Sequence, residues 1–315
     1  MIVLFGANGF LGRNITRRLI DEGLPVRAVI RQPDPEFFEL ARGAEIAYAD
    51  LGDPGTVSRA IVGAETAIQL ASIASPHFGN SRMLEDLNSE VVPQVRFLEL
   101  CKSLGLRRVI FTSSGGTVYG PPLYKPIDEA HPTRPRNSYG LTKLITEKYC
   151  EFYSTNLELE CCVLRIANPF GPHQSFRNGQ GLIPNIAQHC LRGTPVPVYG
   201  TGAAERDYLY VDDLVDAVLA SVRLPQAHGH VINVGSGIGR SVRDVLGAFE
   251  RTLGRPIPQQ QIPIRTTDVE HNVLDITRAR KMLDWAPRTD FETGLRRTLQ
   301  WFGLRDGSPP VPCDP

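Results

Sequence analysis

The chain has 315 residues, of which 42% are hydrophobic and 22% are charged, and its 34 lysine and arginine residues balance 34 aspartate and glutamate residues. This composition is typical of a globular protein and excludes a chain that is mainly disordered. The balanced charge disfavours nucleic acid and membrane surfaces as partners, and no apolar run approaches membrane-spanning length.

The cysteines and the first residues bear on the cellular compartment. No C-x-x-C pair occurs among the six cysteines, so we expect free thiols rather than a disulfide framework, and no metal site. The cysteines are Cys101, Cys150, Cys161, Cys162, Cys190 and Cys313. No basic segment precedes the short apolar run at the start, so we expect no signal peptide and a cytoplasmic protein.

The first thirteen residues, MIVLFGANGFLGR, indicate a phosphate-binding turn. The apolar run Ile2–Phe5 predicts a strand buried on both faces, and Gly6, Gly9 and Gly12 follow it into a helix. Glycine permits both the tight strand-to-helix turn and the close approach of backbone N–H groups to a phosphate. The spacing is G-x-x-G-x-x-G rather than the common G-x-G-x-x-G, so an ordinary glycine-bearing turn is the alternative to a dinucleotide site.

Strands and helices are predicted to alternate along the chain. A helix over residues 14–22, ended by Gly23, and a strand over Val26–Ile30 complete a β-α-β unit. Further strands are expected at residues 44–48, 66–70, 108–112, 161–166 and 230–234, with helices at 88–104 and 211–222 and a last one ending near Phe302. This order predicts an α/β fold with a doubly wound parallel (Rossmann-like) sheet, whose ligands bind beyond the carboxyl ends of the strands.

The sequence pattern changes after Asn168, where glycine and proline recur and the hydrophobic residues show little sustained periodicity. We expect a loop-rich region and a smaller C-terminal substrate-binding lobe. The predicted dinucleotide-binding domain covers residues 1–170, with about 206–235 returning to it. The substrate lobe would cover about 171–205 and 236–303, and residues 304–315 would form a tail.

Tyr139 and Lys143 form a candidate acid–base pair, since Tyr139 alone among the nine tyrosines has a lysine four residues later. Positions i and i+4 share one face of a helix, so the ammonium can lie near the phenol. A nearby cation lowers the phenol pKa from about 10 and makes tyrosine a usable general base. The alternative is a surface aromatic ring stacked over a lysine stem.

A hydroxyl-rich segment, FTSSGGTVYG at residues 111–120, follows the strand that is predicted to end near Thr112. Hydroxyls at the end of a parallel strand suit a substrate hydroxyl or carbonyl, although such a turn can equally cap its own backbone. No aspartate and histidine are placed to suggest a hydrolase triad, so these serines are interpreted as hydrogen-bond donors and not as nucleophiles.

Five motifs occur in the order seen in extended short-chain dehydrogenases/reductases, and the chain resembles their nucleotide-sugar epimerase branch, including UDP-galactose/UDP-glucose 4-epimerases. The motifs are GANGFLG, TSSGGTVYG, YGLTK, RIANPFGP and ERDYLYVDD. The resemblance implies an NAD-dependent epimerase that acts on a nucleotide-diphosphate sugar, a UDP-hexose or UDP-N-acetylhexosamine, through a transient 4-keto sugar. It also implies a homodimer that pairs helices near residues 88–104 and 138–153.

The same resemblance assigns site residues motif by motif. Tyr139 matches the catalytic base, Lys143 its partner on the nicotinamide ribose, and Ser114 the assisting hydroxyl, for which Thr117 could substitute. The substrate-binding positions are Ser114, Thr117, Asn168, Arg206, Arg265 and Asn272, with the two arginines on the diphosphate and Asn272 beside the C2 substituent of the sugar. The cofactor positions are Gly6, Gly9, Phe10, Leu11, Gly12, Arg31, Asp50, Leu51, Leu70, Ala71, Tyr139 and Lys143.

Three departures from the family pattern define the alternatives. The first departure is that TSSGGTVYG is one residue longer than the corresponding family segment. If the family spacing is counted forward from Phe111, the catalytic hydroxyl falls on Ser114, whereas counting back from Gly120 reaches Gly115, which has no hydroxyl. Related dehydratases carry an Asp-Glu pair where this chain has two glycines, so dehydration is disfavoured.

The third departure concerns the cofactor, because the second strand ends in Arg31 and lacks the acidic residue that accepts the ribose hydroxyls of NAD. Arg31 is either a solvated charge or a partner for a 2′-phosphate, so NADP is not excluded. An NADP(H)-dependent 4-keto sugar-nucleotide reductase is therefore the alternative function. A non-catalytic dinucleotide-binding sensor would have no reason to keep Tyr139 and Lys143.

Overall fold

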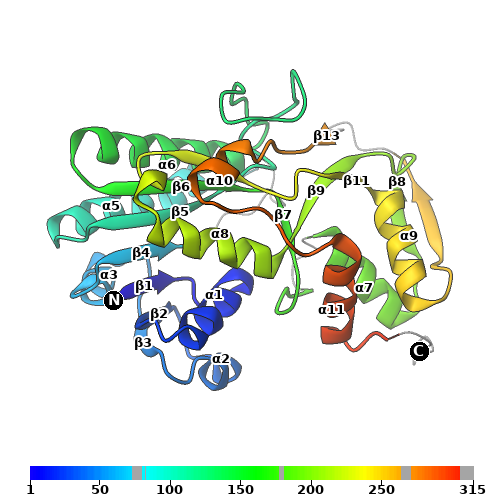
Figure 1. Cartoon of the computed structure of the whole chain (residues 1–315), viewed down its shortest axis with the longest axis horizontal. Coiled ribbons are helices and arrows are strands. Elements are labelled where there is room, and N and C mark those ends of the chain that lie inside the picture. Colours follow the sequence, from blue (N-terminus) through cyan, green and yellow to red (C-terminus); the bar gives the residue numbers. More distant parts are fainter. Residues whose placement is uncertain (73–79, 82, 177–180, 264–270, 306–315) are drawn as a thin grey trace.

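A computed structural model describes residues 1–72, 80–81, 83–176, 181–263 and 271–305. Two groups of elements lie beside each other (Figure 1). One is a sheet covered by helices on both faces, and the smaller one surrounds α7 (Leu182–Arg192), α9 (Val242–Leu253) and α11 (Phe291–Trp301). Within the described residues, no helix has both the length and the apolar character needed to cross a bilayer.

The larger group is built on a seven-stranded sheet with the order β10-β6-β5-β4-β1-β2-β3, in which all pairs are parallel. The strands are β1 (Ile2–Phe5), β2 (Val26–Ile30), β3 (Glu45–Tyr48), β4 (Thr66–Gln69), β5 (Arg108–Ser114), β6 (Glu160–Ile166) and β10 (Val231–Val234). The predicted doubly wound parallel sheet is therefore confirmed.

Alternate residues of the central strands enter two separate hydrophobic cores. In β1, Ile2 and Leu4 join the core on one face of the sheet, beneath α1 (Phe10–Asp21) and α8 (Val211–Arg223). Val3 and Phe5 join the core on the other face, beneath α3 (Pro54–Ile61), α5 (Val92–Ser103) and α6 (Ser138–Asn156). Because both faces are covered, the strand is apolar at every position rather than at every second one. The covering helices are α1 (Phe10–Asp21), α2 (Pro35–Leu40), α3 (Pro54–Ile61), α4 (Met83–Asp86), α5 (Val92–Ser103), α6 (Ser138–Asn156), α8 (Val211–Arg223) and α10 (Thr277–Met282).

The smaller group has its own sheets and core. A four-stranded sheet joins β7 (Asn168–Phe170), β9 (Glu205–Tyr210), β11 (Gly239–Ser241) and β13 (His271–Asn272), while β8 (Val196–Tyr199) pairs with β12 (Gln259–Ile262). Helices α7 (Leu182–Arg192), α9 (Val242–Leu253) and α11 (Phe291–Trp301) pack onto these strands around a third core. Because β7 and β9 both pair here and both adjoin elements of the larger group, they connect the two groups (Figure 1).

The structure corrects several predicted boundaries. Helix α1 begins at Phe10 and not at residue 14, because extended Gly9 serves as its N-cap. The stretch after Asn168 is not merely loop-rich, since it contains the eleven-residue helix α7. Gly193, interpreted as a loop marker, is the left-handed C-cap of α7 at φ +65°, where glycine is favoured.

Two further expectations concern the thiols and the tail. The five cysteines within the described residues are buried and free, as predicted, and Cys313 lies outside those residues. Leu304 is 4% exposed and belongs to the core of the smaller group, so a tail cannot begin at that residue.

Candidate active site

The predicted site residues gather at one edge of the seven-stranded sheet. Gly6 follows β1 and Arg31 follows β2 directly, Asp50 and Leu51 come after β3, and Leu70 and Ala71 come after β4. Ser114 is the last residue of β5. Because all these strands are parallel, their carboxyl ends meet at the same edge, which is where ligands bind in such sheets.

The glycine turn leaves a cradle with no room for side chains. Gly6 has φ +79°, and a Cβ there would lie 3.0 Å from the backbone nitrogen of Ala71. A Cβ on Gly12 would lie 2.2 Å from the carbonyl oxygen of Gly6, so only glycine lets α1 approach β1 this closely. No side chain of the described residues caps the N-terminus of α1. The cradle and the uncapped first turn of this helix fit the pyrophosphate of a dinucleotide.

The other proposed cofactor residues lie on the first turn of α1 and after the strands β3 and β4. Phe10 and Leu11 are partly buried against the core of the smaller group, and Leu51 and Ala71 pack partly buried beneath α3 and α5. The carboxylate of Asp50 accepts a hydrogen bond from the backbone nitrogen of Gly52 at 2.8 Å. These contacts fix the segments that follow β3 and β4.

Arg31 is exposed at the end of β2, whereas the acidic residue of the same loop, Asp34, is engaged elsewhere. Asp34 Oδ2 accepts hydrogen bonds from Arg13 Nη2 at 2.6 Å and Asn8 Nδ2 at 3.1 Å, and Oδ1 accepts one from the backbone nitrogen of Phe37. Burial acts to raise the pKa of Asp34, but these bonds and the Arg13 charge outweigh it and lower that pKa. Asp34 therefore ties the glycine turn to α2.

Tyr139, Lys143 and Ser114 come together where α6 begins beside the end of β5. Asn137 caps α6 by accepting a hydrogen bond from the backbone nitrogen of Gly140 at 2.8 Å, which fixes the first turn. The Ser114 hydroxyl lies close enough to the Tyr139 phenol for hydrogen bonding to lower the pKa of that phenol. Lys143 is buried, its Nζ lies 5.7 Å from the centre of the Tyr139 ring, and it donates to the carbonyl oxygen of Thr112 at 3.3 Å.

The electrostatics of this pair differ from the expectation. The pKa of Tyr139 is raised to about 12: burial is the largest cause, the negative charge of Glu90 adds to it, and hydrogen bonding from Ser114 opposes both. The prediction that Lys143 lowers the phenol pKa is therefore wrong for the residues of this chain. Burial also lowers the pKa of Lys143, although Glu90 and Glu147 act in the opposite direction.

A closed ion pair lies beneath the site. Glu147 receives three hydrogen bonds from the Arg165 guanidinium, of which the Nη2–Oε2 bond is 2.6 Å long, and one from the Ser113 hydroxyl. Both charged side chains are almost fully buried. This pair joins α6 to β6 directly under the turn that carries Lys143.

The proposed substrate residues lie on the smaller group and on the turn after β5. Asn272 in β13 is paired in register with Arg206 in β9, and its amide donates to the carbonyl oxygen of Gly115 at 3.0 Å. Asn168 donates to the carbonyl oxygen of Asp207 at 3.2 Å. The structure thus brings Asn272 and Ser114 to the same turn, with Arg206 next to Asn272. Arg265 lies outside the described residues.

Two buried polar atoms on this side have no hydrogen-bond partner among the described residues. They are the hydroxyl oxygen of Thr117 and the Oδ1 atom of Asn272. An unpaired buried polar atom costs free energy, so such atoms often mark a place where a ligand supplies the missing bond.

Three functional candidates were missed by the sequence analysis: Glu90, Gln94 and Gln69. All three are almost fully buried near the end of β4. Glu90 and Gln94 stand four residues apart on one helical face, which is a polar pair inside an otherwise apolar segment. That spacing could have indicated a buried polar site, but a polar pair on a helix ordinarily faces solvent and is therefore not recognised as functional.

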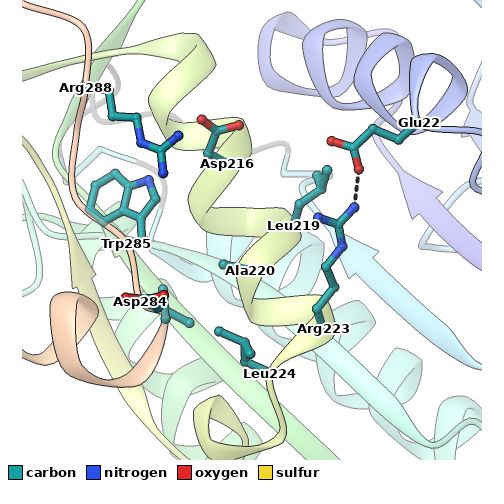
Figure 2. A pocket seen from close by; sticks show the side chains of 10 residues that line it. Glu22, Asp216, Leu219, Ala220, Arg223, Leu224, Asp284, Trp285 and Arg288 are labelled. Carbon is teal, nitrogen blue, oxygen red and sulfur yellow. Dashed lines mark hydrogen bonds and ion pairs between the residues drawn. The ribbon is translucent and has the colours of Figure 1, made fainter.

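A cavity of about 320 Å³ lies away from this site, between α8, the end of α1 and residues 283–288 (Figure 2). The ion pair between Glu22 and Arg223 crosses one side of it, and Trp285 lines another. None of the predicted site residues within the described part of the chain lines this cavity, so it does not compete with the sheet edge as the reaction site. Over the described part of the chain, no group of three or more metal-ligating side chains is assembled.

Comparisons with known proteins agree with this geometry. The profile of the NAD dependent epimerase/dehydratase family matches residues 2–235. The chain is 32% identical to a UDP-glucose 4-epimerase from Mycolicibacterium smegmatis, over 94% of this chain and 96% of that protein. It is 29% identical to a dTDP-4-dehydro-6-deoxyglucose reductase from Escherichia coli, over 95% and 96% respectively.

Among solved structures, the crystal structure of a Thermotoga maritima UDP-glucose 4-epimerase with UDP-glucose superimposes with a TM-score of 0.90 at 30% identity. The match covers 96% of this chain and 98% of that one. The fold, the glycine cradle and the matched profile lead to one conclusion: this chain belongs to the NAD-dependent epimerase/dehydratase family.

Proposed function

We propose that this protein is an NAD-dependent 4-epimerase of a UDP-sugar. The observation that carries the proposal is the meeting of Tyr139, Ser114 and buried Lys143 at the sheet edge that also holds the glycine cradle. The similarity to UDP-glucose 4-epimerases over nearly the whole chain supports the same activity.

The chain's own residues supply the acid–base chemistry. When bound, NAD supplies the hydride acceptor and donor for a transient 4-keto sugar, together with the positive charge of its oxidised ring. Tyr139 Oη takes the proton of the sugar 4-hydroxyl and returns it when the hydroxyl is restored. Ser114 shares that proton through its hydrogen bond with Tyr139. Lys143, buried one turn further along α6, would bind the nicotinamide ribose and so position the ring beside Tyr139.

The nucleotide and the sugar would be held from the smaller group. The guanidinium of Arg206 suits diphosphate oxygens, with Arg265 as a second clamp and Asn168 beside them. By the family resemblance, some epimerases carry a bulky tyrosine next to the C2 substituent of the sugar where this chain has Asn272. The smaller side chain leaves more room there, so we propose that an N-acetyl group at C2 is admitted. Thr117 and Asn272 each have a free polar atom for a sugar hydroxyl or amide.

In this proposal, the two groups of elements bind different ligands, the dinucleotide and the substrate. Residues 1–170 and about 206–235 would bind the dinucleotide through Gly6, Gly9, Phe10, Leu11, Gly12, Arg31, Asp50, Leu51, Leu70 and Ala71. Residues of about 171–205 and 236–303 would bind the substrate. The return of β10 to the seven-stranded sheet supports this discontinuous domain.

We also propose a cytoplasmic homodimer. Large apolar side chains are exposed on the helical segments around α5 and on α6, which supports pairing of these helices across a two-fold axis. They are Met83, Leu84, Leu87, Val92, Leu141, Tyr149 and Phe152.

A 4-keto sugar-nucleotide reductase remains the second candidate. It is favoured by exposed Arg31, which is free to meet a 2′-phosphate, and by the similarity to the reductase from Escherichia coli. Such an enzyme would use the same Tyr139 and Lys143 but release its oxidised cofactor in each cycle.

One experiment separates these functions. The purified protein is denatured, the released dinucleotide is identified, and intact protein is assayed with UDP-glucose and UDP-N-acetylglucosamine without added cofactor. We expect released NAD and formation of the 4-epimer. Protein that is empty and then binds NADPH would favour the reductase.

The variant Tyr139→Phe should lose turnover but keep its fold and its cofactor. Tyr149→Phe, which removes an exposed hydroxyl from the same helix, is the matched control and should keep turnover. Undiminished activity in Tyr139→Phe would refute the assignment of the base.

A further inference from the structure

Glu90 is a buried carboxylate in the reaction site that the proposed mechanism leaves without a role. Its side chain is 4% exposed and lies on a π-helical turn (Leu87–Val91) between α4 and α5. The hydroxyl of Ser72, just after β4, donates a hydrogen bond to Glu90 Oε2 at 2.9 Å. Single π-helical turns occur frequently at functional sites, because the extra residue redirects the side chains that follow.

The helix that carries Glu90 is fixed to the end of β4 by a closed set of amide contacts. Gln94 donates to the carbonyl oxygen of Ala71 at 3.1 Å, and Gln69 donates to Gln94 Oε1 at 3.0 Å. Gln69 Oε1 in turn accepts a hydrogen bond from the backbone nitrogen of Ala71 at 3.0 Å. Because both glutamines are almost fully buried, Glu90 is held at a defined distance from the sheet edge.

Glu90 is also the carboxylate that balances Lys143. Its charge acts on Lys143 and Tyr139 from the turn packed against α6. Glu147, the other carboxylate beside Lys143, is already neutralised by Arg165. A buried ammonium is costly unless a counter-charge lies near it, so Lys143 depends on Glu90.

Other titratable groups near this turn are accounted for. Asp86 is buried on the helical segment just before the turn. The Cys150 thiol lies further along α6, where hydrogen bonding with Cys161 and then burial raise its pKa, so it carries no charge. On the sheet side, the hydroxyl of Ser114 meets the Tyr139 phenol and carries no charge. The site therefore places Lys143 and Glu90 together as opposite charges next to a neutral phenol.

We propose that Glu90 is the counter-ion that biases the bound dinucleotide toward its oxidised form, an inference that rests on the proposed function. The oxidised nicotinamide ring carries one positive charge and the reduced ring carries none. A carboxylate buried beside Tyr139 and Lys143 stabilises the charged ring selectively, because screening is weak there. An epimerase must regain the oxidised form in each cycle, so this bias keeps the enzyme ready for the next sugar.

The test compares the affinities of full-length protein for NAD⁺ and NADH in wild type and Glu90→Gln. NADH binding is followed by its fluorescence and NAD⁺ binding by calorimetry. We expect the ratio Kd(NAD⁺)/Kd(NADH) to rise about tenfold in Glu90→Gln, the factor that corresponds to one pKa unit. Glu99→Gln removes an exposed charge from the same helical region and should leave the ratio unchanged.

A pH profile gives a second readout that a merely structural role would not move. Because the Glu90 charge raises the pKa of both Tyr139 and Lys143, its removal lowers both values. Both limbs of the kcat/KM profile should therefore move to lower pH in Glu90→Gln. Glu90→Asp, which keeps the charge, should restore most of the wild-type profile.

The outcomes separate this inference from the proposed function. An unchanged affinity ratio in folded Glu90→Gln, or an equal change in Glu99→Gln, overturns the role of Glu90 while epimerase turnover stands. If Glu90→Gln does not fold, Glu90→Met removes the charge without adding an unpaired polar atom and decides the same question. Failure of wild-type protein to bind either dinucleotide would refute the proposed function itself and the inference with it.

Discussion

Gly12 provides the sharpest test of the glycine cradle, because replacing it with alanine sets helix propensity against steric overlap. In α1, the new Cβ would lie 2.2 Å from the Gly6 carbonyl oxygen and 2.5 Å from that of Ala7. Both are backbone atoms, so the overlap is relieved only by moving α1 away from β1. Overpacking of this kind costs about 3 kcal/mol, and the better helix propensity of alanine returns about 1 kcal/mol.

The net loss of about 2 kcal/mol is measurable by thermal unfolding and by dinucleotide titration. An unfolding entropy of about 2.1 cal/mol/K per residue makes 1 kcal/mol equal to roughly 1.5 °C for this length, so Tm should fall by about 3 °C. If the displaced α1 weakens dinucleotide binding by the same free energy of about 2 kcal/mol, the affinity falls by more than tenfold, because about 1.4 kcal/mol corresponds to a factor of ten.

The matched control is Gly247→Ala in α9, where the new Cβ would meet only the exposed guanidinium end of the Arg251 side chain, at 3.3 Å, and no backbone atom. This variant should gain up to about 1 kcal/mol and keep its cofactor affinity. If Gly12→Ala bound the dinucleotide as tightly as wild type and unfolded at the same temperature, the cradle would not have the role assigned to it.

Three further predictions concern single side chains. Glu147→Gln leaves Arg165 as an uncompensated buried charge and should lower the free energy of unfolding by about 3–5 kcal/mol in a denaturant titration, whereas an unaltered midpoint would contradict the closed pair. Asp34 has a lowered pKa, so its stabilisation is complete above its unfolded pKa and is lost as pH falls through the folded value. Asp34→Asn should therefore show a shallower loss of Tm below about pH 4 than wild type, and equal slopes would refute this. Asn272→Tyr should reduce turnover of UDP-N-acetylglucosamine far more than turnover of UDP-glucose. An equal effect on both sugars would show that Asn272 does not line the sugar pocket.

The sequence predicts the parts of this site that depend on short spacings. Gly6 and Gly12 identify the cradle because no other residue fits a turn with this approach, and Tyr139 and Lys143 are identified because α6 repeats every 3.6 residues. Ser114 follows from its place at the end of β5. In each case the geometry is set by one element and its immediate neighbour.

Features that depend on distant segments were missed or mistaken. The pKa of Tyr139 was predicted to fall, but burial and the charge of Glu90, on a helical turn packed against α6, raise it. Glu90 itself looks like a solvent-facing residue until the contacts of Gln94 and Ser72 bury it. The helix α7 was missed because Gly181 and Gly193 were interpreted as loop residues, whereas they cap its two ends.

The central claim is an epimerisation in which the hydrogen on sugar C4 leaves and returns within one closed site. The most direct measurement is turnover of the UDP-sugar in D₂O without added dinucleotide, followed by NMR of the product at C4. The account predicts that the 4-epimer forms with its original hydrogen at C4 and no deuterium. Deuterium at C4, or a product that forms only as added reduced dinucleotide is consumed, would contradict it.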